Sequence, residues 1–164
     1  MKRHIRKYMT RHGAQALYSR AVRARGDYVF FQGQTGEDLE RHFVGAGDPG
    51  AQAAQACRNI RILVEEAGGT LEDVCKLVVY VTDVGYRPAV YAAINRHFEG
   101  VHHCSTGVVV KGLATPEMLV EIDAHPVIAP RAKPRKAARA ATRSPGRRAR
   151  PAAAGSSRRA RARF

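Results

Sequence analysis

The run VCKLVVYVT, residues 74–82, constrains the fold more than any other part of this chain. Its apolar and β-branched residues are nearly continuous, which is typical of a strand that is buried on both faces. Just before it lie the glycine pair 68–69, which ends a helix, and residues 70–73 (TLED), whose spacing resembles a capping box around a single turn. We therefore expect a central strand that follows a helix after a short connection.

Two stretches have the pattern of helices. The first begins at Asp48 and Pro49, an N-cap carboxylate followed by proline at the first helical position, and it ends at the glycine pair. Its apolar residues recur mostly at spacings of three and four, on one face: Ala53, Cys57, Ile60, Leu63, Val64 and Ala67. A second helix is predicted over residues 86–98, with Pro88 in its first turn.

Shorter strand patterns lie on both sides of the helices. They cover residues 18–22, 28–31, 39–44, 106–110 and 118–124, and residues 113–117 form a loop with Pro116. Two groups of strands with one helix each predict an α+β, two-layer sandwich in which both helices pack on one face of a mixed sheet. The opposite face then needs cover, which another subunit would supply most simply.

The charge of the chain is divided between its ends and its middle. The formal net charge is +14, from 28 Lys and Arg and 14 Asp and Glu residues. Thirteen basic residues lie in 131–164 and five in 1–15, so residues 16–130 hold ten basic and all 14 acidic residues, a net charge of −4. We expect three parts: a basic N-terminal extension (1–15), a folded domain (16–130) and a disordered Ala/Arg/Pro-rich tail (131–164).

Three interpretations of the tail stay open. It is a basic arm that binds nucleic acid through phosphate contacts, an extension without function, or the product of a shifted reading frame in GC-rich DNA. Because the middle is acidic, nucleic-acid binding is expected only through residues 131–164. The chain has no apolar run long enough for a membrane span, and three cysteines without framework spacing favour a reducing, cytoplasmic location.

Three segments, in this order, resemble the RidA/YjgF family of imine deaminases, also called the endoribonuclease L-PSP family. They are LYSRAVRARGDYVFFQGQTG near the front (17–36), the block around 53–83 that ends in KLVVYVTD, and GLATPEMLVEIDAHPV near the end (112–127). The resemblance implies a chorismate mutase-like fold. It also implies a homotrimer whose sheets form a barrel-like core, with a cleft at each subunit interface.

The resemblance further implies an activity, the hydrolysis of enamine and imine intermediates to a 2-oxo acid and ammonia, without a metal or an organic cofactor. Such chemistry needs a cation for the substrate carboxylate, an acid–base group that orients water, and a mostly apolar cleft. By similarity, Glu121 and Tyr18 are the catalytic candidates. The candidates for substrate binding are Gly33, Ser105, Thr106 and Tyr91.

The cation is where this chain departs from the family pattern. Ser105 stands at the position of the usual arginine, Tyr91 at that of an asparagine in the second helix, and Gly107 at that of a cysteine. A serine cannot bind a carboxylate as an arginine does, so we expect slow hydrolysis of 2-imino acids or none. Lys111 and Arg96 are two cations that could replace the arginine.

A cluster of His97, His102, His103 and Cys104 suggests a metal site or a cysteine nucleophile at first sight. The spacing matches no zinc motif, and adjacent residues of a strand point to opposite faces, so no metal is predicted.

Three interpretations of the function therefore remain. The first is a homotrimer that binds a small carboxylate or carbonyl metabolite at its interfaces. It could be a weak or altered deaminase of the 2-iminobutanoate/2-iminopropanoate type. The alternatives are a non-catalytic ligand-binding or regulatory module, and an RNA-directed translation inhibitor or endoribonuclease that uses the basic tail.

Overall fold

The protein is described here by a computed structural model, which covers residues 3–9 and 15–130, with side chains from Tyr18 onward. The tail predicted at 131–164 lies outside the described residues. Among the described residues, no helix combines the length and the apolar character that a membrane crossing requires.

Both predicted helices are confirmed. Helix α1 spans Pro49–Glu66, and its N-cap Asp48 accepts hydrogen bonds from the backbone N–H groups of Gly50 (2.9 Å) and Ala51 (3.0 Å). Helix α2 spans Arg87–His97 and follows the 3₁₀ turn η2 (Val84–Tyr86). The predicted capping box is also present at the 3₁₀ turn η1 (Leu71–Asp73) that precedes the central strand.

The main sheet has four strands in the order β3-β6-β4-β5, where β3 is Asp27–Tyr28, β6 is Val120–Ile128, β4 is Val74–Val81 and β5 is Cys104–Val109. Strand β4 is central, as predicted. It runs parallel to β5 and antiparallel to β6, so the sheet is mixed. Helix α2 makes the crossover that parallel neighbours require.

Two further strands, β1 (Arg3–Met9) and β2 (Gln15–Arg23), form an antiparallel pair. Strand β2 confirms the strand predicted at 18–22, whereas β1 was not predicted. The pair joins the rest of the domain beside β5, where the backbone N–H of Ser19 donates to the carbonyl of His103 at 2.8 Å.

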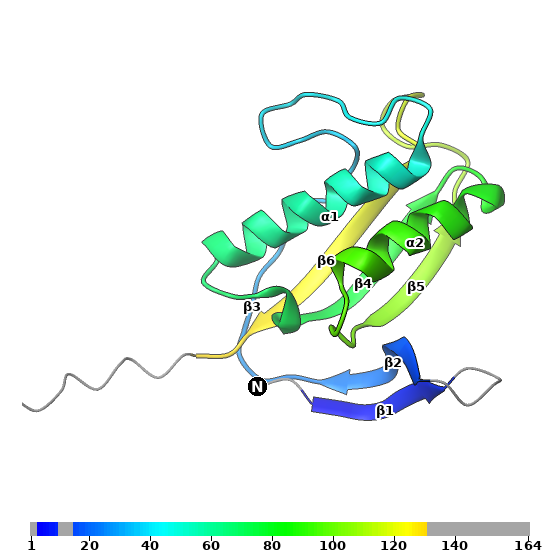
Figure 1. Ribbon diagram of the computed structural model, residues 1–164. Coiled ribbons are helices and arrows are strands. Elements are labelled where there is room, and N and C mark those ends of the chain that lie inside the picture. The colour runs from blue at the N-terminus through cyan, green and yellow to red at the C-terminus, as the bar shows by residue number, and fades with distance from the viewer. Residues whose placement is uncertain (1–2, 10–14, 131–164) are drawn as a thin grey trace, which may run out of the picture. The chain divides into compact units, whose positions relative to one another are not determined.

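The helices α1 and α2 lie side by side over one face of the sheet (Figure 1), which confirms the two-layer α+β architecture. The side chains of Leu77, Val79 and Val81 on β4 are buried beneath them. Those of Val78 and Tyr80 point to the opposite face, called the outer face below, and are only partly buried. Burial on both faces was predicted for this strand, so that prediction is wrong for the single chain.

Two other predictions are wrong in detail. The strand predicted at 28–31 is reduced to the two residues of β3. The one predicted at 39–44 is a loop with a single bridge between Glu37 and Phe43. The loop curls because Arg41 has a left-handed backbone (φ 71°) and because the Asp38 carboxylate accepts from the backbone N–H of His42 (2.8 Å), which competes with strand pairing.

Candidate functional site

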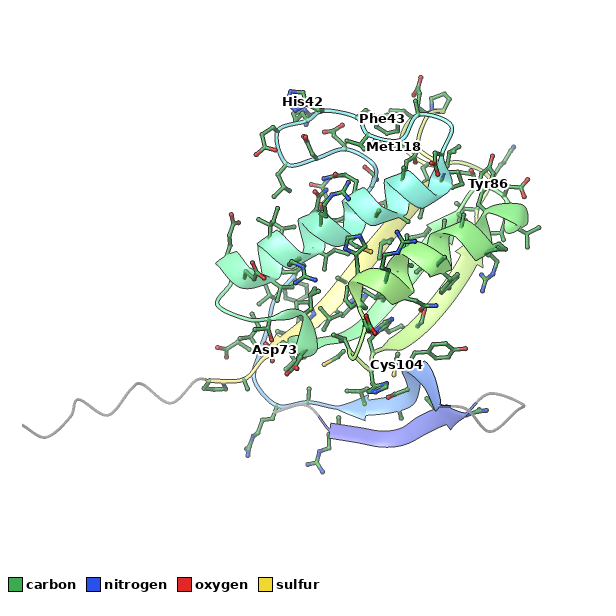
Figure 2. All side chains as sticks on the ribbon, viewed as in Figure 1. His42, Phe43, Asp73, Tyr86, Cys104 and Met118 are labelled. Atoms are coloured by element: carbon green, nitrogen blue, oxygen red, sulfur yellow. The ribbon has the colours of Figure 1, made fainter. Side chains whose placement is uncertain are left out.

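A pocket of about 330 Å³ opens at one end of the sheet. It lies between the segment 32–41, the loop before β6 and the start of β6 itself. Figure 2 labels Met118, which lines the pocket, together with His42 and Phe43 of the neighbouring loop at this end of the domain. The lining residues include Gln32, Gly33, Gln34, Thr35, Glu37, Asp38, Leu39, Arg41, Ala114, Met118 and Glu121.

Glu121 and Gly33 meet in this pocket because a backbone bridge holds their segments together. Gln34 and Ile122 exchange two hydrogen bonds, N–H to carbonyl, of 2.9 and 2.8 Å. The residues next to this bridge, Gly33 and Glu121, face the same side. A Cβ added to Gly33 would overlap the Glu121 carboxyl oxygen and lie 2.8 Å from its Cδ. Only glycine therefore leaves the carboxyl group its present place.

Partial burial raises the pKa of the Glu121 carboxyl group, and the nearby charge of Asp123 raises it further. Asp123 itself accepts a hydrogen bond of 2.9 Å from the hydroxyl of Tyr80 on the adjacent strand. A carboxyl group with a raised pKa keeps its proton to a higher pH, so it can act as an acid as well as a base.

The buried amide of Gln52, in the second turn of α1, fastens the walls of the pocket to the helix. Its Nε2 donates to the carbonyls of Gly45 (3.0 Å) and Glu117 (2.9 Å), and its Oε1 accepts from the N–H of Leu119 (2.8 Å). These bonds tie the loop before α1 and the loop before β6 to one side chain, so the pocket is held by the core and not by its loops alone.

The rim of the pocket is polar. The carboxylate of Asp38 accepts from the N–H groups of Glu40 (3.0 Å) and His42 (2.8 Å) and lies 3.2 Å from Nδ1 of His42. The bond from the His42 backbone is the main reason that the pKa of Asp38 lies below its ordinary value. Arg41 forms an ion pair with Glu37 at 3.6 Å. Both pairs are exposed, so they shape the loop and add little stability.

A second polar cluster lies on the other face of the sheet, between α2 and β5. The Arg87 guanidinium lies over the ring of Tyr91, with Cζ 5.0 Å from the ring centroid. Both side chains also contact Gly107 of β5, where an added Cβ would overlap Arg87 Nη1 and Tyr91 Oη. The side chain of Ser105 lies on the same face as Gly107, two residues earlier, and its Oγ is buried without a hydrogen-bond partner among the described residues.

The register of the sheet therefore divides the predicted site residues into two groups. Glu121 pairs with Tyr80, so it lies on the outer face with Gly33. Ser105 pairs with Leu77, whose side chain is buried beneath the helices, so it lies on the helix face with Tyr91. Within one chain, the two groups do not form a single site.

Thr106 and Tyr18 belong to neither group. Thr106 pairs with Val78 on the outer face and is exposed. Tyr18 forms a bridge with His103, just before β5, and its side chain is partly buried. In Figure 2, Cys104 marks this end of β5, opposite the end at which Met118 is labelled.

No group of three or more His, Cys, Asp or Glu side chains within the described ranges is arranged to hold a metal ion. The histidines near Cys104 have other surroundings. His103 is buried, its Nδ1 lies 3.1 Å from the carbonyl of Val101, and its ring packs edge-on against Phe98 at 5.2 Å.

Sequence reasoning missed Arg87 and Gln52. The signal for Arg87 was present, since an arginine at the start of a helix one turn before Tyr91 has the i, i+4 spacing of a stacked pair. Its position over β5 depends on how α2 crosses from β4 to β5, which no local sequence pattern predicts. Gln52 gave no signal, because a glutamine in the first turns of a helix is usually exposed.

Comparisons with known proteins agree with this fold. The family model described as Endoribonuclease L-PSP matches residues 9–128. A RutC family protein of Pyrococcus abyssi is 30% identical over 107 residues, which are 65% of this chain and 83% of that protein.

Two solved structures extend the likeness. A member of the YjgF family from Mycobacterium tuberculosis is 36% identical, with a TM-score of 0.54 over 68% of this chain and 86% of that one. RidA from the Antarctic bacterium Psychrobacter sp. is 30% identical, with a TM-score of 0.57 over 68% and 88%. On the fold, the order of its elements and these matches, the chain belongs to the RidA/YjgF family.

Proposed function

We propose that this protein binds a small carbonyl or carboxylate-bearing metabolite in clefts between the subunits of a homotrimer, and that it hydrolyses small imines there. The observation that carries the proposal is the carboxyl group of Glu121, which lies in the 330 Å³ pocket against the bare backbone of Gly33. Because its pKa is raised, this carboxyl group keeps its proton to a higher pH than an ordinary glutamate and can both give and take a proton.

The reaction needs one water molecule and no oxidant. The proton of Glu121 goes to the imine nitrogen, while the oxygen of a water molecule forms a bond to the imine carbon. A proton of that water returns to the carboxylate and leaves a neutral carbinolamine. The C–N bond then breaks as nitrogen takes up a further proton from Glu121 and the hydroxyl group gives its own proton to the carboxylate, which yields the oxo compound and ammonia and restores protonated Glu121.

The arrangement of the predicted residues supports an assembly. Glu121 and Gly33 lie on the outer face, whereas Ser105 and Tyr91 lie on the helix face beside β5, an edge strand of the main sheet. A second copy whose β5 edge approached the outer face would bring the two groups together. The outer face is also incompletely covered, since Val78 and Tyr80 are only partly buried on it.

The test is a coupled assay in which an amino-acid oxidase generates 2-iminobutanoate and the release of ammonia is followed. The wild type is expected to accelerate hydrolysis, and Glu121→Gln, which cannot give up a proton, is expected to reduce the rate about a hundredfold. Glu72→Gln, at the other end of the sheet in the exposed part of η1, is the matched control. Equal rates for Glu121→Gln and the wild type would contradict the proposal.

A second candidate is ligand binding without turnover, and the small side chains at Ser105 and Gly107 favour it. An arginine on β5 is what the family likeness implies at the first of these positions, and its absence argues for weak catalysis. Under this alternative, the protein binds 2-oxo acids, yet the coupled assay shows no acceleration by the wild type. The RNA-directed alternative depends on residues 131–164, which lie outside the described residues.

A further inference from the structure

The guanidinium of Arg87 is held in one place by its neighbours, yet no carboxylate among the described residues neutralises its charge. Its guanidinium lies 5.0 Å from the centre of the Tyr91 ring, a distance at which the cation and the ring attract each other. The guanidinium also reaches Gly107, where its Cζ would be 3.1 Å from an added Cβ. The ring and the bare backbone of β5 together fix the direction of this long side chain.

Within residues 18–130, no carboxylate forms an ion pair with Arg87, and no carbonyl accepts a hydrogen bond from it. Arg87 is also the first residue of α2, whose first turn contains no acidic residue. A positive charge at the start of a helix is unfavourable, because the helix dipole is positive at the same end. An anion bound here would relieve this repulsion and would satisfy the donors of the guanidinium.

A second, independent observation is a buried hydroxyl on the same face. Ser105 and Gly107 both lie on the helix face of β5, and alternate residues of a strand are spaced by roughly 7 Å. The Oγ of Ser105 is buried, yet it has no hydrogen-bond partner among the described residues. A buried hydroxyl without a partner costs free energy, so a ligand oxygen that reached it would be favoured.

We propose that Arg87 binds the carboxylate of the substrate, with Tyr91 holding the guanidinium and Ser105 contributing a hydrogen bond. This inference rests on the proposed function, since it assigns the substrate to the 2-imino and 2-oxo acids. A guanidinium without a hydrogen-bond partner among the described residues keeps N–H donors for two parallel hydrogen bonds to a planar carboxylate. A helix residue thus supplies the charge that β5 lacks, and Gly107 provides the space for it.

The experiment measures binding of 2-oxobutanoate to the full chain by isothermal titration calorimetry. The wild type is expected to bind it, and Arg87→Gln to bind at least about tenfold more weakly, because charge-assisted hydrogen bonds are lost. Arg87→Lys keeps the positive charge but loses the two parallel N–H donors of the guanidinium. Its affinity is expected to lie between those of the wild type and Arg87→Gln. Arg61→Gln, an exposed arginine of α1, is the control and is expected to bind as the wild type does.

Two further arms test the geometry. Gly107→Ala keeps the guanidinium, but the added methyl group occupies the space on β5 in which the guanidinium lies. This variant is therefore expected to bind more weakly as well. The neutral ketone 2-butanone is expected to bind poorly to the wild type and equally poorly to Arg87→Gln. Unfolding temperatures of all variants show whether a loss of affinity follows from a loss of structure.

The outcomes separate this inference from the proposed function. If 2-oxobutanoate binds equally to the wild type and to Arg87→Gln, the inference is overturned, and Lys111→Gln and Arg96→Gln then show whether another cation is used. If binding depends on Arg87 but Glu121→Gln does not change imine hydrolysis, the inference holds and the proposed catalysis fails. Tight binding of inorganic phosphate with none of 2-oxobutanoate would overturn the assignment to carboxylates.

Discussion

The backbone of Gly33 lies against the carboxyl group of Glu121, and the two are held there by the hydrogen-bonded bridge between Gln34 and Ile122. The contact is made of one backbone and one flexible side chain. Any side chain at position 33 would therefore displace the carboxyl group before it displaced the strand.

Gly33→Ala is expected to fold normally and to lose activity. The added methyl group moves the Glu121 carboxyl group by an ångström or more, and a shift of that size costs on the order of a hundredfold in rate. Initial rates in the imine assay check this, with Gly112→Ala as the control because a Cβ there would meet nothing within 4 Å. A Gly33→Ala enzyme as fast as the wild type would show that the position of this carboxyl group is unimportant.

The raised pKa of Glu121 makes stability depend on pH in a defined direction. The protonated carboxyl group is favoured in the folded state, so its contribution is fully present below the ordinary glutamate pKa of about 4.3 and is lost as the pH rises through the higher folded value. Glu121→Gln is thus expected to be more stable than the wild type at pH 7, by no more than about 1 kcal/mol because water screens the group, and to match it at pH 4. Urea unfolding at a fixed protein concentration measures the difference. A variant that is less stable than the wild type at pH 7 would contradict the sign.

Gln52→Leu is expected to be strongly destabilised, by about 3 kcal/mol or more. The leucine leaves the carbonyls of Gly45 and Glu117 and the N–H of Leu119 without their partner in a buried place. Gln52→Glu keeps the acceptor for Leu119 but loses both donors, so it should also unfold more easily. Thermal unfolding tests both, and a Gln52→Leu protein as stable as the wild type would mean that water replaces these bonds.

Cys57 is expected to resist thiol reagents in the folded protein. Burial on the inner face of α1 raises its pKa to about 12, so at pH 8 almost none of it is the reactive thiolate. A chromogenic disulfide should therefore label at most two of the three cysteines, Cys75 and Cys104, until denaturant is added. Rapid labelling of all three in buffer would indicate that α1 opens readily.

The assembly is tested with residues 1–130 alone. We expect a trimer, because β5 is an edge strand and the outer face of the sheet is only partly covered in one chain. Sedimentation velocity at micromolar concentration checks it. A stable monomer would remove the proposed cleft between subunits.

The elements that depend on local rules were predictable from the sequence. Asp48 with Pro49 marks the start of α1, and the Thr70–Asp73 box marks the turn before β4, because both are made by residues that are close in the chain. The segment 39–44 is a loop and not the predicted strand, because its residue types do not reveal that Asp38 bonds backbone groups within the loop.

The site was predictable by residue type and family likeness but not by arrangement. The pairing of Glu121 with Tyr80, and of Ser105 with Leu77, assigns the two residues to opposite faces, and this follows from register, which the sequence of one strand does not contain. The position of Arg87 over Gly107 depends on how α2 crosses from β4 to β5, which is a long-range property as well.

The edge of the sheet at β5 has a consequence for the newly made chain. Within the described residues, strand β2 pairs with this edge only at the bridge between Tyr18 and His103, before β5 begins. Near the other end of β5, Val108 is 37% exposed and Val109 is 51% exposed, so apolar side chains lie beside an edge that can add another strand. The unpaired backbone groups of an edge strand can pair with an extended segment of another chain. When many copies are made close together on one messenger RNA, another copy of the same chain would be the first partner that each edge meets.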